Sequence, residues 1–462
     1  MYDEQPGEGM TTHANLSHDK VEQHIPWPTR RNAITLLVIV TVTYVLSFVD
    51  RQVLSLLVEP MRRDLGLTDM QLSLLQGMAF ALIYCLAGLP LGRAADQFSR
   101  RNIIVVGVVI WCVMTGLCGI VSGFGLLFIC RAGVGIGEAA LSPSAYSMLT
   151  DTFPPRRLPL VMSIYNLGPS IGTGLAYLLG GVMLSIAGSQ SSIKIGFLPD
   201  LRAWQATFIV IGGSGLLMAI LMLLVREPAR RIAAQEKHLE ASFGETLRFL
   251  SRHRRSLSAL IVGVALVSVV NYASITWYPT MFARSFSQDV ARVGLVYGPI
   301  YVVSGIAGNL MGAWGAAKMA ARQHRAPYVL WVLIAAVCLT IGSTIVPLLT
   351  ELHVSYAATA VMLLFQNGWM GSAVAAAHLA TPNRMRAQLT AITLFGTNIV
   401  GLACGPSLVA AVTEYVFRDP LALRYSLSIL SAIFGALAIV VLGYCWRNFA
   451  APGMDGLTAV RH

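Results

Sequence analysis

Twelve long apolar segments, separated by short polar stretches, run along this 462-residue chain. A helix needs about 20 apolar residues to cross the hydrocarbon core of a bilayer. The predicted spans are residues 33–59, 71–93, 102–121, 125–149, 158–185, 203–225, 257–281, 293–315, 326–349, 354–379, 388–412 and 424–446. The pattern therefore predicts an all-α polytopic membrane protein with twelve transmembrane helices in two six-helix bundles.

The polar stretches between these spans complete the predicted organisation. We expect, in order, an N-terminal tail, a first bundle, a central loop, a second bundle and a C-terminal tail, at residues 1–32, 33–225, 226–256, 257–447 and 448–462. Cytoplasmic loops carry an excess of Lys and Arg. With both termini in the cytoplasm, about 23 of these residues fall on the inner side and about 8 on the outer side. The sequence therefore predicts a multi-pass protein of a bacterial inner membrane with both termini cytoplasmic.

Composition supports the membrane assignment and excludes several classes. Hydrophobic residues make up 55% of the chain and charged residues 12%, against roughly 25% charged in soluble domains. The net charge of +11 does not indicate nucleic-acid binding, because the basic residues lie in short loops rather than on one polar face. The seven cysteines fall in apolar segments without metal-ligand spacing. We therefore expect no metal and no cofactor.

The two halves look like repeats of one another. A Gly-Pro-Ser triplet at 168–170 recurs at 405–407, and the glycine pair at 88 and 92 recurs at 308 and 312. Six-helix halves in the same orientation imply a pseudo-two-fold axis along the membrane normal, with a site between the halves. This is the geometry expected of a carrier whose halves rock against each other.

The segment between the second and third spans carries the most specific motif. Gly92, Asp96, Arg100 and Arg101 have the spacing of Gly-x-x-x-Asp followed by basic residues, and resemble motif A of the major facilitator superfamily. Gly92 is expected to allow close helix packing. The resemblance implies that Asp96 caps the eleventh helix, and Arg100 or Arg101 is placed to reach Asp151. The alternative is a solvated basic turn that only obeys the positive-inside rule.

Glycines in the fourth and fifth spans have two further patterns. Those at 133, 135 and 137 mimic a dinucleotide-binding fingerprint, but no strand precedes them and they lie within a span, so that function is excluded. They are expected to allow tight helix packing. The segment 168–174 resembles motif C of the same superfamily, which implies export by antiport. A packing kink is the alternative explanation.

At closer range the chain resembles the Spinster branch of the major facilitator superfamily. The resemblance rests on residues 50–52, 74–77, 131–139, 151–153, 204, 367–369 and 384–387. It implies transport of lysolipids, sphingosine phosphate or other amphipathic organic compounds. The second half departs more from the family, since its motif-A position, 312–318, lacks the Asp.

Four charged residues lie well inside predicted spans, away from the span ends. A charge at this depth costs several kcal/mol unless it is paired or neutralised. Counted from the predicted helix ends, Asp50 and Arg131 lie at similar depth and are expected to pair, while Glu138 lies two turns deeper on nearly the same face as Arg131. We predict that Asp50 and Glu138 carry protons and that Arg131 switches between them or contacts an anionic substrate. Arg51 is a weaker candidate, because it points about 100° away around its helix. A static buried ion pair is the alternative.

Polar and aromatic residues within spans are candidates for the substrate cavity. Such side chains provide hydrogen bonds and apolar walls for an amphipathic ligand. The predicted lining residues are Tyr146, Asn166, Asn271, Trp277, Asn367 and Trp369. The alternative is that they join helices or anchor at the interface.

Together these features predict a secondary active transporter, monomeric and surrounded by membrane lipids. Its predicted partners are protons and a small amphipathic organic or lysolipid-like solute, with export as the favoured direction. The alternatives are an uncoupled facilitator or channel, and proton-coupled uptake of an organic anion. A pump with its own ATPase or a membrane enzyme is disfavoured, because the sequence has no Walker motif, nucleophile elbow or zinc-binding His-Glu-x-x-His, and no catalytic residue is predicted.

Overall fold

The computed structural model describes residues 27–187, 200–231 and 242–449. The remainder of the predicted tails (1–26 and 450–462) and of the central loop (232–241) lies outside the described residues. Twelve helical segments in the described part are long and apolar enough to cross a membrane. They are Arg30–Leu65, Asp69–Gln97, Arg100–Cys118, Phe124–Thr152, Leu158–Ile186, Ala203–Leu223, Arg254–Ser285, Val290–Ala321, Pro327–Leu348, Leu352–Leu379, Gln388–Phe417 and Pro420–Asn448. The predicted number and order of spans are confirmed.

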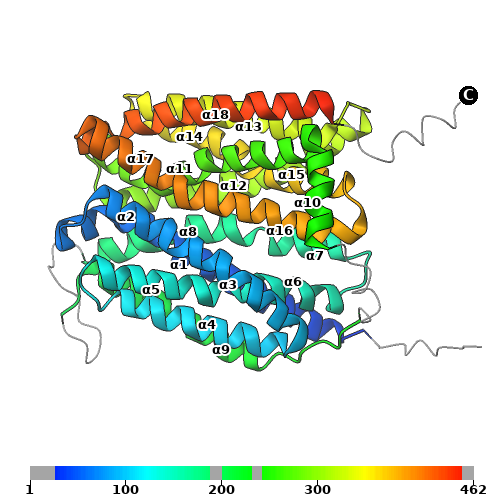
Figure 1. Cartoon of the computed structure of the whole chain (residues 1–462). Coiled ribbons are helices and arrows are strands. Elements are labelled where there is room, and N and C mark those ends of the chain that lie inside the picture. The colour runs from blue at the N-terminus through cyan, green and yellow to red at the C-terminus, as the bar shows by residue number, and fades with distance from the viewer. Residues whose placement is uncertain (1–26, 188–199, 232–241, 450–462) are drawn as a thin grey trace, which may run out of the picture.

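Several spans consist of two or more helical elements (Figure 1). In the first half the elements are α1 (Arg30–Leu65), α2 (Asp69–Gln76), α3 (Met78–Gln97), α4 (Arg100–Cys118), α5 (Phe124–Ala139), α6 (Leu141–Thr152), α7 (Leu158–Tyr165), α8 (Gly168–Ala187) and α9 (Ala203–Leu223). The others are α10 (Phe243–Arg252), α11 (Ala259–Ser285), α12 (Val290–Ala321), α13 (Pro327–Ile345), α14 (Leu352–Asn367), α15 (Met370–Leu379), α16 (Arg386–Gly396), α17 (Gly405–Ala411) and α18 (Leu423–Asn448).

The interruptions within spans occur where the sequence weakens the helix. The break between α7 and α8 precedes Pro169, and a π-helical segment, Thr397–Cys404, joins α16 to α17 just before Pro406. Proline lacks the N–H that would bond one turn back, so the helix needs a local change of pitch. The repeated Gly-Pro-Ser triplets therefore mark a bend in both halves.

The bundle has two ends, which we name by the chain. Because the spans alternate in direction, Arg30 and Asn448 lie at the same end, here called the tail end (Figure 1). The turns after α1 and before α18 lie at the opposite end. One helix, α10, runs across the tail end of the bundle rather than along it (Figure 1).

The two halves meet most extensively along α8 and α12. Glycines line this contact: a methyl group on Gly174 would lie 2.7 Å from the carbonyl oxygen of Gly298, and one on Gly181 would lie 2.8 Å from that of Ala291. Small residues let membrane helices approach through their backbones. The junction between the halves also includes contacts of α3 with the π-helical segment Thr397–Cys404, of α1 with α11 and of α2 with α17.

Glycines also set the packing inside the first half, with one exception. A methyl group on Gly137 would lie 2.6 Å from the backbone nitrogen of Trp111 in α4, and one on Gly135 would lie 2.8 Å from the carbonyl oxygen of Phe80 in α3. The expected tight packing of these α5 glycines is confirmed. Gly92 behaves differently, because a methyl group there would meet no atom within 4 Å. The expected close approach at Gly92 is therefore absent from this conformation.

Candidate functional site

Two ion pairs join α1 to α5 in the interior of the first half. Nη1 of Arg131 lies 3.3 Å from Oδ1 of Asp50, and the hydroxyl of Thr115 in α4 donates to the other carboxylate oxygen. Asp50 and Arg131 are both completely buried. The pairing that the depth of these residues predicted is therefore present.

The second pair joins Arg51 to Glu138. Nη2 of Arg51 lies 2.5 Å from Oε2 of Glu138, and both side chains are buried. The guanidinium also lies over aromatic rings, 4.1 Å from the ring centre of Phe80 and 4.6 Å from that of Phe48. The ranking of Arg51 as the weaker candidate is corrected here, since Arg51, not Arg131, holds Glu138.

The geometry of the two helices explains this arrangement of the central charge cluster (Asp50, Arg51, Arg131 and Glu138). Neighbours on α1 point about 100° apart, so Asp50 faces Arg131 while Arg51 turns toward Glu138, two turns further along α5. Within the described residues, Nε of Arg51, Nε of Arg131 and Oε1 of Glu138 are buried without a hydrogen-bond partner. The cluster therefore keeps unused donors and an unused acceptor.

Tyrosine rings lie beside this cluster in the first half. Tyr165 stacks on Tyr44 with ring centres 4.5 Å apart, and Tyr146 meets Tyr165 edge-on at 5.1 Å. The hydroxyl of Tyr146 donates to Oδ1 of Asn166 at 2.6 Å. Tyr146 and Asn166 are exposed, so these two predicted cavity residues are open to a ligand.

The other four predicted cavity residues divide into two groups. Asn271 and Asn367 are partly exposed, and Oδ1 of Asn367 accepts from Ser170 at 3.0 Å, across the junction between the halves. Trp277 and Trp369 are 0% and 2% exposed, so neither lines an open cavity in this structure. Trp277 instead donates to the carbonyl of Pro406 at 2.9 Å and joins α11 to α17. In this conformation Trp277 joins helices, as the alternative predicts, and the predicted role of both tryptophans in a substrate cavity stays a prediction.

A second charged cluster closes the opposite end of the bundle. Nε of Arg284, at the end of α11, lies 2.6 Å from Glu59, and its two terminal nitrogens each lie 2.7 Å from an oxygen of Asp69. Glu59 and Asp69 belong to the first half and Arg284 to the second. Two-point binding of a guanidinium to a carboxylate fixes geometry as well as adding energy. The Arg284 cluster (Arg284, Glu59 and Asp69) therefore holds the halves together at this end.

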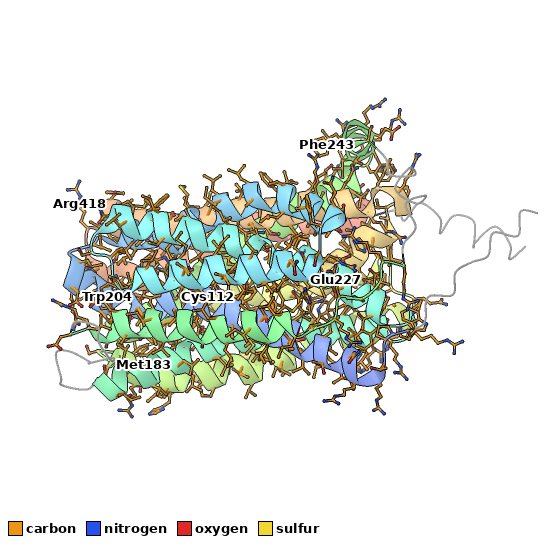
Figure 2. All side chains as sticks on the ribbon, turned by 90° about the horizontal axis from the view of Figure 1, so that it is seen from below. Cys112, Met183, Trp204, Glu227, Phe243 and Arg418 are labelled. Carbon is orange, nitrogen blue, oxygen red and sulfur yellow. The ribbon has the colours of Figure 1, made fainter. Side chains whose placement is uncertain are left out.

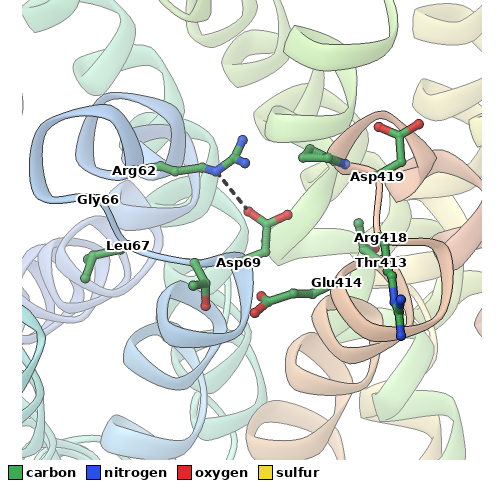
Figure 3. Close-up of a pocket in the computed structure, with 10 residues that line it drawn as sticks. Arg62, Gly66, Leu67, Asp69, Thr413, Glu414, Arg418 and Asp419 are labelled. Carbon is green, nitrogen blue, oxygen red and sulfur yellow. Dashed lines mark ion pairs between the residues drawn. The ribbon is translucent and has the colours of Figure 1, made fainter.

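A surface depression of about 450 Å³ lies next to this cluster (Figure 3). Residues of both halves line it, including Arg62, Asp69, Glu414 and Asp419. Arg62 lies 3.8 Å from Asp69, and the backbone N–H of Met70 donates to Glu414 at 2.9 Å. The lining of the depression is therefore charged, and it includes Asp69, which takes part in the ion pairs that join the halves.

Arg100 organises the tail end of the first half. It forms an ion pair with Asp151, and its Nη1 donates to Ser147 of α6 at 2.9 Å. Glu227, beyond α9, accepts from the backbone N–H of Arg100 at 2.9 Å and from Ser99. The Arg100 cluster (Arg100, Asp151 and Glu227) therefore lies within the first half and the segment that follows it, and the expected reach to Asp151 is confirmed for Arg100.

The segment after α9 extends this network over the motif-A turn. Arg230 donates to the carbonyl oxygens of Ala95, at 2.9 Å, and of Asp96, at the end of α3. Arg231 donates to the backbone oxygen of Asp151 at 2.9 Å. Arg101 donates to the neighbouring Asn102 at 3.2 Å and, at 3.4 Å, to the carbonyl of Val225. The Asp96 side chain is exposed, which leaves its predicted capping role untested by this conformation.

Sequence reasoning missed the residues whose partners come from distant segments. No site role was predicted for Glu59, Asp69, Arg284, Glu227 or Arg230. Glu59 ends the first predicted span, and the other four lie in the polar stretches between spans. The available signal was the charges themselves. Acidic residues lie on either side of the turn after α1, and a basic residue lies at the end of α11. Glu59 and Asp69 are also buried, which hydropathy alone does not indicate.

Comparison with known proteins identifies the family. The family model described as Major Facilitator Superfamily matches residues 40–406. The chain belongs to the major facilitator superfamily. It is therefore an integral multi-pass membrane transporter rather than an enzyme.

Its relatives within the superfamily include Spinster proteins. Protein spinster homolog 3 of Danio rerio is 26% identical over 414 residues, covering 85% of this chain and 79% of that protein. An MFS-type efflux pump of Mycolicibacterium smegmatis is 24% identical, covering 88% of this chain and 89% of that protein. A probable L-galactonate transporter of Escherichia coli is 24% identical and covers 89% of this chain and 90% of that protein.

Solved structures agree with the fold. A bacterial homolog of the human lysosomal transporter Spinster, in an inward-facing and unoccupied conformation, superposes with a TM-score of 0.73 at 23% identity, covering 91% of this chain and 97% of that one. A D-xylose-proton symporter superposes with a TM-score of 0.66 at 16% identity, covering 90% and 98%. The resemblance to the Spinster branch is thus found in both sequence and fold.

The Arg284 cluster gives a first prediction. Arg284→Gln leaves two buried carboxylates with only the more distant Arg62, 3.8 Å from Asp69 and 4.0 Å from Glu59, so the cost approaches the roughly 3–5 kcal/mol of a broken buried ion pair. We expect a lower unfolding temperature in detergent, and faster labelling of a cysteine placed at Ser73, which is buried between the halves, by a reagent applied at the opposite end. Arg202→Gln is the matched control, because its partner Asp64 is at the same end but Arg202 is 56% exposed. Equal effects of the two substitutions would contradict a special role for Arg284.

The Arg100 cluster gives a pH-dependent prediction. Burial raises the pKa of Glu227, but hydrogen bonds from Ser99 and Arg100 outweigh it and hold the pKa below the ordinary value of 4.5. An acid with a lowered pKa stabilises the fold above its unfolded-state pKa, and loses that contribution as pH falls through its folded-state pKa. We expect Glu227→Gln to lower stability by about 1 kcal/mol at neutral pH, with the difference shrinking below pH 4.5.

Thermal unfolding in detergent across a pH series measures this difference. The exposed residue Glu351, which makes no side-chain cap at the start of α14, provides the control substitution Glu351→Gln. A loss of stability for Glu227→Gln that stays constant down to the lowest pH would show that the charge of Glu227 is irrelevant.

Proposed function

We propose that this transporter is a proton-coupled secondary carrier that moves a small amphipathic, lysolipid-like organic solute by alternating access. The observation that carries the proposal is the central charge cluster, with two buried ion pairs between α1 and α5. All eight buried charged residues in the described part of the chain belong to the first half. Coupling is therefore assigned to the first half, and the solute to the space between the halves.

The two ion pairs of the central charge cluster support proton coupling. Each carboxylate has one arginine, and Oε1 of Glu138 and Nε of Arg51 are buried without partners among the described residues. A carboxyl group that gains and loses its arginine partner and its contact with water changes its proton affinity. In the proposed cycle, protonation of Glu138 releases Arg51, and protonation of Asp50 releases Arg131. A released guanidinium is then available to an anionic part of the solute.

The solute class is proposed from the residues around the cluster. Tyr44, Tyr146 and Tyr165 offer apolar faces with polar edges, and Asn166 and Asn367 add hydrogen-bonding groups. Such a lining suits a molecule with both a polar and an apolar part. The named functions of relatives support an amphipathic solute, because one is a sphingosine-1-phosphate transporter of Xenopus tropicalis. Export is proposed from the segment 168–174 and from the efflux pump among the relatives.

Alternating access requires each end of the bundle to open in turn. In this structure the inter-half polar contacts described above run from Ser170, in the middle of the bundle, to the Arg284 cluster at the opposite end. We place the tail end in the cytoplasm, so that this conformation has its outer side closed. Asp96 is proposed to hold the halves together in the other state by capping the eleventh span, from a turn that Arg100 fixes within the first half through Asp151 and Glu227. A single chain carries out this cycle, as a monomer.

Uphill transport in proteoliposomes tests the proposal. A thermal-shift screen of lysolipids, bile acids and aromatic acids first selects a ligand, because binding raises the stability of the folded state. With an imposed pH gradient, the parent protein should accumulate the ligand against its own gradient. Asp50→Asn or Glu138→Gln should reduce this accumulation to the level of empty liposomes while ligand exchange without a gradient continues.

Each alternative has its own outcome in this experiment. An uncoupled facilitator or channel would equilibrate the ligand in the parent protein as well. Proton-coupled uptake of an organic anion would concentrate the ligand on the side that receives the protons, and export on the other side. If both variants accumulate ligand with the parent's pH dependence, the ion pairs are structural and the coupling proposal is wrong.

The proposed role of Asp96 gives a separate prediction. Asp96→Ala removes the acid expected to cap the eleventh span when the tail end is closed. The population should then shift toward the state open at the tail end, and a cysteine placed at Asn166 should react faster with a reagent applied from that side. Asp289→Ala, at the start of α12, is a comparison at the opposite end. Unchanged labelling in Asp96→Ala would contradict the gating role.

A further inference from the structure

The helix α10, between the two halves, is amphipathic in an unusual way. One face, with Thr246 and Leu250, is buried against the bundle. Beside that face, Phe243 and Leu247 lie one turn apart and are 60% and 46% exposed. Two large apolar side chains on an exposed edge cost free energy in water, and such an edge marks an interaction surface.

A basic surface accompanies this apolar edge. Arg248 and Arg252 lie on the outer face of α10, and Arg254 and Arg255 follow in the turn that leads into α11, all exposed. The exposed acid on the helix is Glu245, whose side chain accepts from the backbone N–H of Ser242 and so completes the N-terminal cap. Exposed arginines next to exposed apolar residues are the pattern of a helix that lies on a membrane surface.

The position of α10 fits a membrane surface as well. Its axis runs across the directions of the spans (Figure 1), and Figure 2, which looks along it, shows the helix with Phe243 projecting from the flank of the bundle near the tail end. A helix that projects sideways at the level where the spans end meets the headgroup region of the bilayer.

Two contacts tie α10 to the second half. The hydroxyl of Thr246 donates to Oε1 of Gln388, at the start of the eleventh span, at 2.6 Å. The hydroxyl of Ser258 in the following turn donates to the carbonyl of Leu250 at 3.0 Å. A force that acts on α10 from the membrane surface is therefore transmitted to the end of the span that motif A is proposed to engage.

We propose that α10 is a docking surface for anionic phospholipid. Phe243 and Leu247 enter the boundary between headgroups and acyl chains, and Arg248, Arg252, Arg254 and Arg255 bind the negatively charged headgroups. Basic residues beside a membrane are attracted by anionic lipids within about a Debye length of the surface. The bound lipid holds α10, and through Thr246 and Gln388 it restrains the second half at the tail end.

Site-directed spin labelling of the full chain measures where the apolar edge lies. Single cysteines replace Phe243, Leu247 or Glu245 in a background without the seven native cysteines, and the protein is reconstituted into phosphatidylcholine vesicles with 25% phosphatidylglycerol, on the order of natural anionic content. Labels at 243 and 247 should be accessible to oxygen, which partitions into lipid. The label at 245 should be accessible to a water-soluble nickel complex. Nickel accessibility at all three positions would overturn the proposal.

A charge variant tests the lipid class. At a fixed fraction of phosphatidylglycerol, Arg248→Gln with Arg252→Gln should shift the equilibrium between immersed and water-exposed label at 243 toward water, by roughly fivefold for each arginine. Arg156→Gln with Arg157→Gln is the matched control, because these arginines are exposed in the loop between the fourth and fifth spans. Equal shifts in both variants, or immersion that is independent of phosphatidylglycerol, would show that the headgroup charge is not recognised. Dipolar coupling between labels on different molecules would instead assign the surface to a second copy.

Discussion

A charge inside a membrane protein must have a partner, and this constraint shapes the whole first half. Removing one member of a buried ion pair costs about 3–5 kcal/mol, because the other member remains desolvated. Asp50 and Arg51, adjacent on α1, each find their partner on α5, so the two helices are held in a single register. The glycines of α5 let its backbone approach α3 and α4 closely, so α5 is held by packing on one side and by ion pairs with α1 on the other. The ion pairs therefore depend on the packing and in turn fix it.

The same constraint has opposite consequences at the two ends of the bundle. Arg100 finds all its named partners in the first half and in the segment that follows it, so this cluster moves as one body with that half. Arg284 belongs to the second half, and its carboxylates, Glu59 and Asp69, belong to the first. When the halves move apart at the opposite end, the Arg284 cluster has to break while the Arg100 cluster stays intact. Alternation between two states requires contacts of both kinds.

Hydropathy predicted the twelve spans because a span is a local property of the sequence. The pairing of Asp50 with Arg131 was predictable from depth, since both residues were counted along straight helices. The pairing of Arg51 with Glu138 was not, because it depends on how α1 and α5 are rotated about their axes. The Arg284 cluster joins residues more than 200 positions apart in the sequence. The hydropathy pattern does not indicate which of such distant residues come into contact. The burial of Trp277 in this conformation was not predictable, because an aromatic residue in a span has the same hydropathy whether it joins helices or lines a cavity.

The segment between the halves connects these elements without rigidly coupling them. Its first part is fixed to the first half, where Arg230 and Arg231 bind carbonyl oxygens of α3 and α6, and its last part, α10, is fixed to the second half through Thr246. The described attachments on the two sides of this segment therefore belong to different halves. Neither of them bonds one half to the other. Lipid bound at α10 would therefore act on the second half, while the first half keeps its charge clusters unchanged.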